Sequence, residues 1–488
     1  MQRTSHTHPI EIAEVTAQRG QGRIGITFCP GKVDPAAATG AWHRDLGLDL
    51  DAIADWGASA VITLIEDHEI DHLQVRDLGR EVERRYMQWL HLPIQDVSVP
   101  GPTFEAAWEA QGEGIRARLR DGFDVLVHCR GGLGRAGTIA ARLLVELGVA
   151  PTEAIAQVRG VRPGAIETGE QENHVLIQSA LSKGQPETTG DAIRDRAIGA
   201  LLGLAVGDAL GTTLEFQSRD SYEPITGIVG GGPFHLQPGE WTDDTAMALA
   251  LAESLAACDG LDEADLMGRF DDWFQNGAFS CTGVCFDIGI TTSRALQRWR
   301  ATGNPHSGAT DPNTAGNGSL MRLAPATVRY WRDRDTLRDV AARQSRTTHS
   351  AAEAVDACVL WAEMLADAIE GAPRAEVLRN RTGTYSGNIA GIAAGSWRGK
   401  ARDAIRASGY VVHSAEAALW SVGRSCDFPT SVLTAANLGE DADTTAAIAG
   451  QLAGALYGAS DIPAEFLHPI AWRERIEAVA VALFDAGL

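Results

Sequence analysis

DVLVHCRGGLGRAGTIAARLLVELG, residues Asp124 to Gly148, is the stretch that decides the fold of the first part of the chain. Its apolar start predicts a buried strand, its glycine-rich middle a tight turn, and the run from Thr138 a helix. Up to about residue 181, other short apolar runs such as AVITLIE (residues 60–66) alternate with helix-like segments. We therefore predict an α/β domain, with a central sheet flanked by helices.

The turn CRGGLGR has the residue types of a phosphate-binding loop. Its successive backbone N–H groups precede a helix N-terminus, an arrangement that binds anions and favours a thiolate at Cys129. The planar guanidinium of Arg135 would bind two phosphoryl oxygens, and Asp96, in the loop LPIQDVSVPGP, is the candidate general acid. The loop residues expected to bind phosphate are Arg130, Gly131, Gly132, Leu133 and Gly134. The alternative is an ordinary strand–turn–helix crossover with a buried cysteine.

The motifs VHCRGGLGRAGT and LPIQDVSVP, with RPGAIETGEQ further on, resemble the cysteine-dependent protein tyrosine and dual-specificity phosphatases, in particular the kinase-associated phosphatase type. The resemblance implies that Cys129 is the nucleophile and places Gln171 near the site. Members of that family commonly have Ser or Thr directly after the loop arginine, where the hydroxyl helps the thiolate leave. This chain has Ala136 there, so slow turnover is expected unless Thr138 substitutes.

Length and charge limit the remaining possibilities. A chain of 488 residues is expected to form more than one domain, and SKGQPETTGD (182–191) has the composition of a linker. We predict an N-terminal extension (1–24), a phosphatase-like domain (25–181) and a second domain (192–488). A net charge of −22 argues against a nucleic-acid partner, except for a terminal phosphate as substrate. The first thirty residues lack the apolar run of a signal peptide, and no run suggests a membrane span, so a cytoplasmic protein is expected.

The second domain is predicted to be all helical, because Ala-rich segments with apolar residues three and four apart dominate it. Two acidic clusters, WTDDTA (241–246) and GEDADTTAA (439–447), each precede such a segment. Carboxylates and hydroxyls without His or Cys favour hard cations, Mg²⁺ or Mn²⁺, and two clusters brought together would hold two ions. The alternative is helix capping by Thr and Asp. The five carboxylates that would repel one another without a cation are Asp243, Asp244, Glu440, Asp441 and Asp443.

Six ordered segments of this domain, among them GALLGLAVGDALGTTLEF, GEWTDDTAMALALAESL, GNGSLMRLAPA and NLGEDADTTAAIAGQLAGALYG, resemble the ADP-ribosylglycohydrolases, particularly the type that reactivates ADP-ribosylated dinitrogenase reductase. The resemblance implies removal of ADP-ribose and a dinuclear magnesium site. Its implied ligands are Thr242, Asp243, Asp244, Asp441, Asp443 and Thr444. Glu215 and Asp287 rank equally as the catalytic acid or base. Positions matching the ADP-ribose site are Asn317, Gly318, Ser319, His349 and Tyr410, whereas Asp208 is interpreted as structural.

The prediction is thus a bifunctional hydrolase acting on ADP-ribosylated and phosphorylated proteins or small molecules. One alternative is a reader, a protein that binds ADP-ribose or phosphoryl groups without turning them over. For His349 and Tyr410, a helix cap or core position is the competing interpretation. The sequence leaves open the linkage that is cleaved, the phosphatase substrate, the oligomeric state and whether both activities share one substrate.

Overall fold

The computed structural model describes residues 3–37, 40–181 and 190–487. These form two compact units, one mainly from residues before 182 and one mainly from residues after 189, and each is described by itself. Most of the predicted linker, residues 182–189, lies outside the described residues, and the first helix of the second unit begins at Gly190.

The first unit has the expected α/β fold. Its main sheet has the order β1-β2-β7-β5-β6, in which only the pairing of β1 with β2 is antiparallel. The strands of this sheet are β1 (Ala13–Val15), β2 (Ile24–Phe28), β5 (Ala58–Thr63), β6 (Gln88–His91) and β7 (Asp124–Cys129). A separate ribbon joins β3 (Val33–Asp34) to β4 (Trp42–His43).

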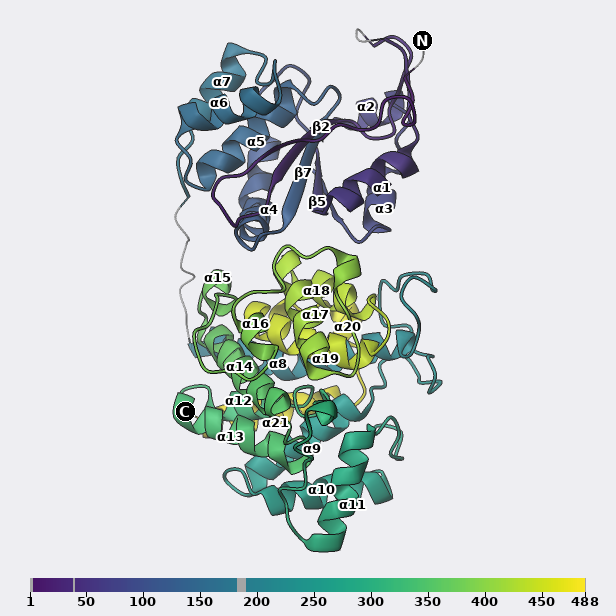
Figure 1. Cartoon of the computed structure of the whole chain (residues 1–488), viewed down its shortest axis with the longest axis vertical. Coiled ribbons are helices and arrows are strands. Elements are labelled where there is room, and N and C mark those ends of the chain that lie inside the picture. Colours follow the sequence, from purple (N-terminus) through teal and green to yellow (C-terminus); the bar gives the residue numbers. More distant parts are fainter. Residues whose placement is uncertain (1–2, 38–39, 182–189, 488) are drawn as a thin grey trace. The chain divides into compact units, whose positions relative to one another are not determined.

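Helices cover both faces of this sheet, α1 and α3 on one side and α4 and α5 on the other (Figure 1). The helices are α1 (Leu46–Trp56), α2 (Asp67–His72), α3 (Leu78–Glu83), α4 (Pro102–Arg120), α5 (Gly134–Glu146), α6 (Pro151–Val161) and α7 (Gly169–Leu176). Strand β7 is central and buried from Val125 onward, which explains its uninterrupted apolar sequence. It pairs with β2 so that Cys129 lies opposite Phe28, and the nucleophile candidate therefore stands at the carboxyl end of the central strands.

Strand β1 lies within residues 1–24, for which we predicted an extension outside the phosphatase-like domain. It pairs with β2 and adds an edge strand to the domain's sheet, with Glu14 opposite Gly25. The short strand has one buried residue, Val15, so its sequence shows no clear alternation.

The second unit is helical, with isolated bridges but no named strand among the described residues. Its longer helices are α8 (Gly190–Gly211), α9 (Asp243–Ala257), α10 (Glu263–Asn276), α11 (Ile290–Thr302), α12 (Ala324–Tyr330), α13 (Arg334–Thr348), α14 (Ala352–Glu370), α17 (Val411–Arg424), α18 (Phe428–Ala436), α19 (Ala442–Tyr457) and α21 (Arg473–Ala486). Short helices are η1 (Thr212–Leu214), η2 (Pro312–Thr314), α15 (Arg374–Val377), α16 (Ile389–Ala393), η3 (Arg402–Ala404), η4 (Ala459–Asp461) and α20 (Ala464–Leu467).

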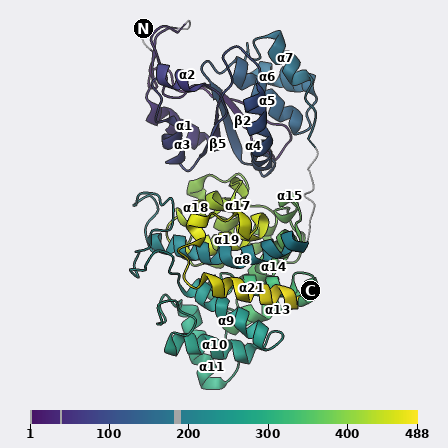
Figure 2. The same ribbon diagram turned by 180° about the vertical axis from the view of Figure 1, so that it is seen from behind.

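Helices α8 and α19 lie side by side at the centre of this unit (Figure 2). Glycines make the approach possible, because a β carbon on Gly203 would lie 2.2 Å from the carbonyl oxygen of Gly450, and one on Gly450 would lie 2.0 Å from that of Gly203. Gly199 and Gly454 face each other in the same way one turn further along. The contact therefore brings two helix backbones together without side chains between them.

The segment Gly190–Leu214 is the one described helix long and apolar enough to cross a membrane, with a mean hydropathy of 1.6. In the structure 89% of the apolar window is buried inside the protein, largely against α19. The segment is therefore the core helix of a folded domain.

Candidate active sites

The first candidate site surrounds Cys129, whose side chain is buried where β7 ends. Its Sγ accepts a hydrogen bond from the backbone N–H of Gly132 at 3.2 Å. Gly132 has φ +70°, and a β carbon there would lie 2.4 Å from the carbonyl carbon of Thr27, so only glycine fits. The loop then enters α5 at Gly134, so the predicted helix is present but begins before Thr138, the residue at which we expected it to start.

Two carboxylates, those of Glu69 and Asp96, contact the guanidinium of Arg135. Its two terminal nitrogens donate to the carboxylate of Glu69 at 2.5 and 2.8 Å, and Nη2 lies 3.0 Å from Oδ1 of Asp96. Burial would raise the pKa of Glu69, but the hydrogen bonds from Arg135 hold it below its ordinary value. The structure therefore brings Cys129, Arg135 and the half-exposed Asp96 to one place, with the acid on the loop after β6.

Three residues that the sequence did not single out hold the loop. Lys32 donates to the carbonyl oxygen of Arg130 at 3.2 Å, and Arg162 donates to that of Gly132 at 3.0 Å. Glu69 orients Arg135. Lys32 and Glu69 lie far from CRGGLGR and from the other quoted motifs, so no local pattern could identify them, whereas Arg162 is the first residue of RPGAIETGEQ and could have been found there.

Neighbouring positions are also fixed. Gln171 is buried, and its Nε2 donates to the carbonyl oxygen of Ser98 at 3.1 Å, tying α7 to the loop that carries Asp96. Arg130 pairs with Asp34 at 2.8 Å. Thr138 donates its hydroxyl to the carbonyl oxygen of Gly134 at 2.8 Å.

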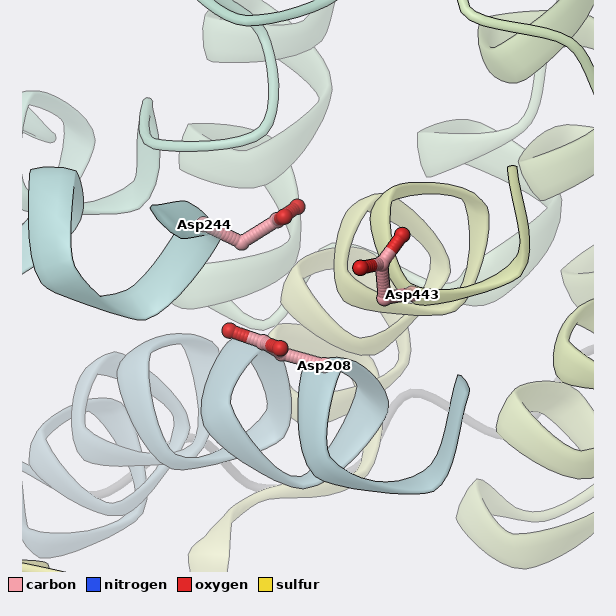
Figure 3. Close-up of side chains that lie close together, drawn as sticks. All are labelled: Asp208, Asp244 and Asp443. Carbon is pink, nitrogen blue, oxygen red and sulfur yellow. The ribbon is translucent and has the colours of Figure 1, made fainter. Parts of the chain in front are cut away.

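In the second unit the two acidic clusters meet at the N-termini of α9 and α19. Oxygen atoms of Asp208, Asp244 and Asp443 lie within 4.8 Å of one another, and the same holds for Glu215, Asp441 and Asp443. Figure 3 shows the first group, with each carboxylate on a different helix. Because the groups share Asp443, they form one continuous acidic centre.

Four hydrogen bonds hold the carboxylate of Asp208 in this centre. It accepts from the backbone N–H and hydroxyl of Thr242, at 2.8 and 2.9 Å, and from those of Thr245, at 2.9 and 2.6 Å. These donors account for the acceptor sites of both oxygens. Asp208 therefore fixes the first turn of α9, which agrees with its interpretation as structural although it also lies in the acidic group.

The residues present fit bound cations. Burial, and next the carboxylate of Asp443, raise the pKa of Asp243 well above its ordinary value and that of Asp441 to about 7. Oδ1 of Asp244 is buried without a hydrogen-bond partner among the described residues. Buried carboxylates so close together are unfavourable unless protonated or bound to a cation, and an all-oxygen donor set suits a hard cation. The exception among the five predicted carboxylates is Glu440, which is partly exposed and lies 4.0 Å from Arg219.

A cavity of about 730 Å³ opens above the acidic centre. Both candidate acids line it. Glu215 accepts hydrogen bonds from the backbone N–H groups of Ala442, at 2.7 Å, and Asp443, at 3.4 Å, so it caps α19. Asp287 belongs to neither acidic group; burial and the nearby Asp443 raise its pKa to about 11.

The positions matched to the ADP-ribose site divide into three sets. Asn317, Gly318 and His349 line the cavity, and Asn317 donates to Asp441 at 2.7 Å. Ser319 points into the core, where its hydroxyl lies 2.8 Å from that of Ser345. Tyr410 lines a neighbouring cavity of about 840 Å³, and its hydroxyl bonds to Glu353.

The fold and sites define a two-domain hydrolase: a helical domain with an acidic centre that could hold a cation, and a phosphatase-type domain with a cysteine at the end of a central strand. A sequence model of the ADP-ribosylglycohydrolase family matches residues 189–487, and one described as Swiss Army Knife protein, DSP-PTPase phosphatase domain, matches residues 33–175. The chain belongs to the ADP-ribosylglycohydrolase family and also carries a dual-specificity-phosphatase-type domain.

Individual proteins match each half. The chain is 47% identical over 297 residues to the ADP-ribosylarginine hydrolase Tri1 of Pseudomonas putida, covering 61% of this chain and 80% of that protein. It is 30% identical over 136 residues to cyclin-dependent kinase inhibitor 3 of Rattus norvegicus, covering 27% of this chain and 63% of that protein. A solved structure, described as an ADP-ribosylglycohydrolase-related protein complex, is 40% identical with a TM-score of 0.55, covering 61% of this chain and all of that chain.

Proposed function

We propose that the helical domain hydrolyses the N-glycosidic bond between ADP-ribose and an arginine side chain of a modified protein, with two Mg²⁺ ions. The observation that carries the proposal is the pair of acidic groups sharing Asp443 beneath a cavity large enough for a nucleotide-sized ligand. The arginine linkage is supported by the similarity to an ADP-ribosylarginine hydrolase.

The ions would be held by the predicted ligands, with Glu215 completing one group. Bound there, they would balance the carboxylate charge and polarise the ribose hydroxyls. Asn317 orients Asp441 by its hydrogen bond, and Asp208 orients Thr242. Thr444 extends its hydroxyl toward Asp244 at 3.3 Å.

The reaction adds water to the anomeric carbon and breaks its bond to the arginine nitrogen, which takes up a proton. One side chain must take the proton from water and deliver it to the leaving nitrogen. Asp287 suits this role because it lines the cavity outside both acidic groups, whereas Glu215 is held as the cap of α19. Burial, and next the negative charge of Asp443, raise the pKa of Asp287; bound cations would offset that charge and would so allow the Asp287 carboxylate to accept the proton. Positive charge that develops on the ribose would be stabilised by the surrounding carboxylates.

For the first domain we propose hydrolysis of phosphate monoesters. The Cys129 thiolate attacks phosphorus, the phosphorus–oxygen bond breaks, and Asp96 protonates the leaving oxygen. Water then attacks the phosphocysteine, which releases phosphate and regenerates the thiolate. The contacts of Arg135 with Glu69 and Asp96 support this assignment, because they hold the guanidinium beside the candidate general acid.

The first test measures release of free ADP-ribose from arginine-linked and serine-linked peptides, with Mg²⁺ and with chelator. We expect Mg²⁺-dependent release from the arginine-linked peptide and loss of that release in Asp243→Asn. Cys129→Ser is the matched control and should release ADP-ribose normally. Binding of ADP-ribose without release from either peptide would favour the reader alternative.

A further inference from the structure

His349 presents one ring nitrogen to the cavity above the acidic centre. The residue is only 2% exposed and lines the cavity beside Gly316 and Gly318. A β carbon on Gly316 would lie 3.1 Å from Nε2, which shows that this nitrogen faces the glycine-lined wall. No residue in the described ranges forms a hydrogen bond with Nε2, so the buried ring offers an unpaired polar atom to whatever fills the cavity.

The opposite ring nitrogen is fixed from behind. Nδ1 of His349 lies 2.8 Å from the hydroxyl oxygen of Thr348, and Nη2 of Arg322 donates to the same oxygen at 2.9 Å. Arg322 is fully buried, and its guanidinium carbon lies 4.6 Å from the centre of the Phe270 ring. A guanidinium has donors only, so the direction of its hydrogen bond is not in doubt.

These contacts determine where the imidazole proton is. The Thr348 oxygen accepts from Arg322, and its single proton has no described acceptor other than Nδ1 of His349. Nδ1 is therefore an acceptor, and a neutral imidazole then carries its proton on Nε2. Burial, and next the positive charge of Arg322, lower the pKa of His349 to about 3, so the ring is neutral at physiological pH.

The family resemblance already places His349 in the ADP-ribose site; we infer that Thr348 and Arg322 are positioning residues that lock its ring in the Nε2–H tautomer, so that it acts as a donor to an acceptor oxygen of bound ADP-ribose. The substrate part of this inference rests on the proposed function. ADP-ribose offers acceptor oxygens on its diphosphate and on its terminal ribose, and a neutral donor suits either. The inference makes the buried pair behind the cavity a determinant of substrate affinity.

Thr348→Val is the decisive variant, because it removes the hydroxyl at nearly constant volume. Thr347→Val is its matched control: the Thr347 hydroxyl also accepts from Arg322, at 3.2 Å, but no hydrogen bond joins it to His349. Thr348→Ser restores the hydroxyl. Nitrogen-15 spectra of histidine-labelled free protein, with the His349 signals assigned by their loss in His349→Gln, report the tautomer directly.

We expect the Nε2–H form in the wild type, Thr347→Val and Thr348→Ser, and a mixture or the Nδ1–H form in Thr348→Val. An Nδ1–H form in the wild type, or an unchanged tautomer in Thr348→Val, would overturn the positioning role. This readout requires neither substrate nor turnover.

Calorimetry with ADP-ribose tests the donor. In Thr348→Val the hydrogen bond from Nε2 of His349 to the ligand should be weakened or lost. Loss of one neutral hydrogen bond should lower the affinity of this variant for ADP-ribose roughly threefold to tenfold, with KM rising and kcat little changed. Affinity in Thr348→Val equal to that in Thr347→Val would overturn the donor role.

A parallel titration with ADP, which lacks the terminal ribose, locates the acceptor oxygen. A loss of affinity for both ligands places the acceptor on the ADP part, whereas a loss of affinity for ADP-ribose alone places it on the terminal ribose. If the wild type binds no ADP-ribose, the proposed function fails while the tautomer is still measured.

Discussion

Ala136, directly after Arg135, governs the second step of the proposed phosphatase reaction. It is fully buried and supplies no hydroxyl for the departing thiolate. Ala136→Ser should therefore speed breakdown of the phosphocysteine, and we expect the steady-state rate to rise about tenfold, less than the roughly hundredfold or more typical of one positioned general acid or base. Rapid-mixing kinetics with an aryl phosphate would show the initial burst of the wild type disappear in the variant.

Thr138 provides the control for this prediction. Its hydroxyl donates to the carbonyl oxygen of Gly134, so it is already used within α5. Thr138→Val should leave both the burst and the steady-state rate nearly unchanged. A large fall in the steady-state rate of Thr138→Val would instead assign the missing hydroxyl function to Thr138.

The two candidate acids of the second site should behave differently when each is made neutral. Asp287→Asn should reduce ADP-ribose release at least a hundredfold while retaining ADP-ribose affinity, because Asp287 lines the cavity outside both acidic groups. Glu215→Gln should bind Mg²⁺ more weakly, because Glu215 lies in an acidic group, and should have a lower melting temperature, because Glu215 caps α19. Titration of each variant with Mg²⁺, followed by the ADP-ribose release assay, distinguishes a catalytic acid from a metal ligand. Equal Mg²⁺ affinity in Glu215→Gln and in the wild type would show that Glu215 is not a ligand of the cation site.

The residues that lie together in the first site could be predicted from residue type and spacing, whereas their catalytic roles stay predictions. Cys129, Arg135 and Asp96 could be paired from their spacing, and the structure places them together. Ser319 shows the limit, because its neighbours Asn317 and Gly318 line the cavity while its own side chain points into the core. Side-chain direction within a loop depends on backbone angles that residue types do not determine.

At the scale of secondary-structure elements, the glycines between α8 and α19 hold the acidic centre together. A β carbon on Gly203 would collide with the carbonyl oxygen of Gly450, so Gly203→Ala should push the helices apart. We expect a loss of about 1–3 kcal/mol or more in the free energy of unfolding, measured by denaturant titration. The same variant should bind Mg²⁺ more weakly, because α8 and α19 both carry carboxylates of one acidic group.

A second glycine tests whether helix propensity alone explains the effect. Gly268 lies within α10, and nothing is found within 4 Å of a β carbon built there. Gly268→Ala should be neutral or stabilise the protein by about 0.5–1 kcal/mol. Similar destabilisation by both substitutions would contradict the close-contact explanation.

Cation binding should stabilise the helix termini that carry the carboxylates. Because α9 and α19 begin in the acidic centre, an ion that binds only the folded protein raises its melting temperature, by about 5 °C at saturating Mg²⁺. Differential scanning calorimetry with Mg²⁺ and with chelator measures this shift, and Asp443→Asn should abolish it. An unchanged transition in the wild type would argue against a cation in this centre.

Element positions followed well from sequence where periodicity was long. The Ala-rich segments after residues 242 and 441 are helices α9 and α19, as expected. The meeting of their N-termini could not be derived from residue patterns alone, because it depends on the packing of α8 between segments distant in the sequence. Strand β1 was missed because three residues carry too little periodicity.

At the scale of the whole molecule, the two sites should be separable by chemistry. Chelation should stop ADP-ribose release and leave phosphatase activity intact, whereas alkylation of Cys129 should do the reverse. The deeply buried Cys29, whose pKa burial raises, should stay unmodified. Parallel assays on one preparation measure both activities, and loss of both after either treatment would show that the sites depend on each other.

Sharing of one substrate is a separate question for the whole chain. ADP-ribose attached through a phosphoryl group would, after glycosidic cleavage, leave a phosphate monoester for the other domain. Such a conjugate should yield inorganic phosphate with the wild type but not with Asp243→Asn. Unchanged phosphate release by Asp243→Asn would show that the domains act independently.

The pairing of α8 with α19 also has a consequence during protein synthesis. Helix α8 emerges from the ribosome first in its domain, whereas α19 is among the last helices to be made. Until then the apolar face of α8 lacks its main partner, and exposed apolar surface of this kind promotes aggregation. The phosphatase-type domain precedes α8 in the chain and can fold early. The helical domain, in contrast, cannot complete its core until α19 has been synthesised. A nascent chain stalled before α19 should therefore need a chaperone.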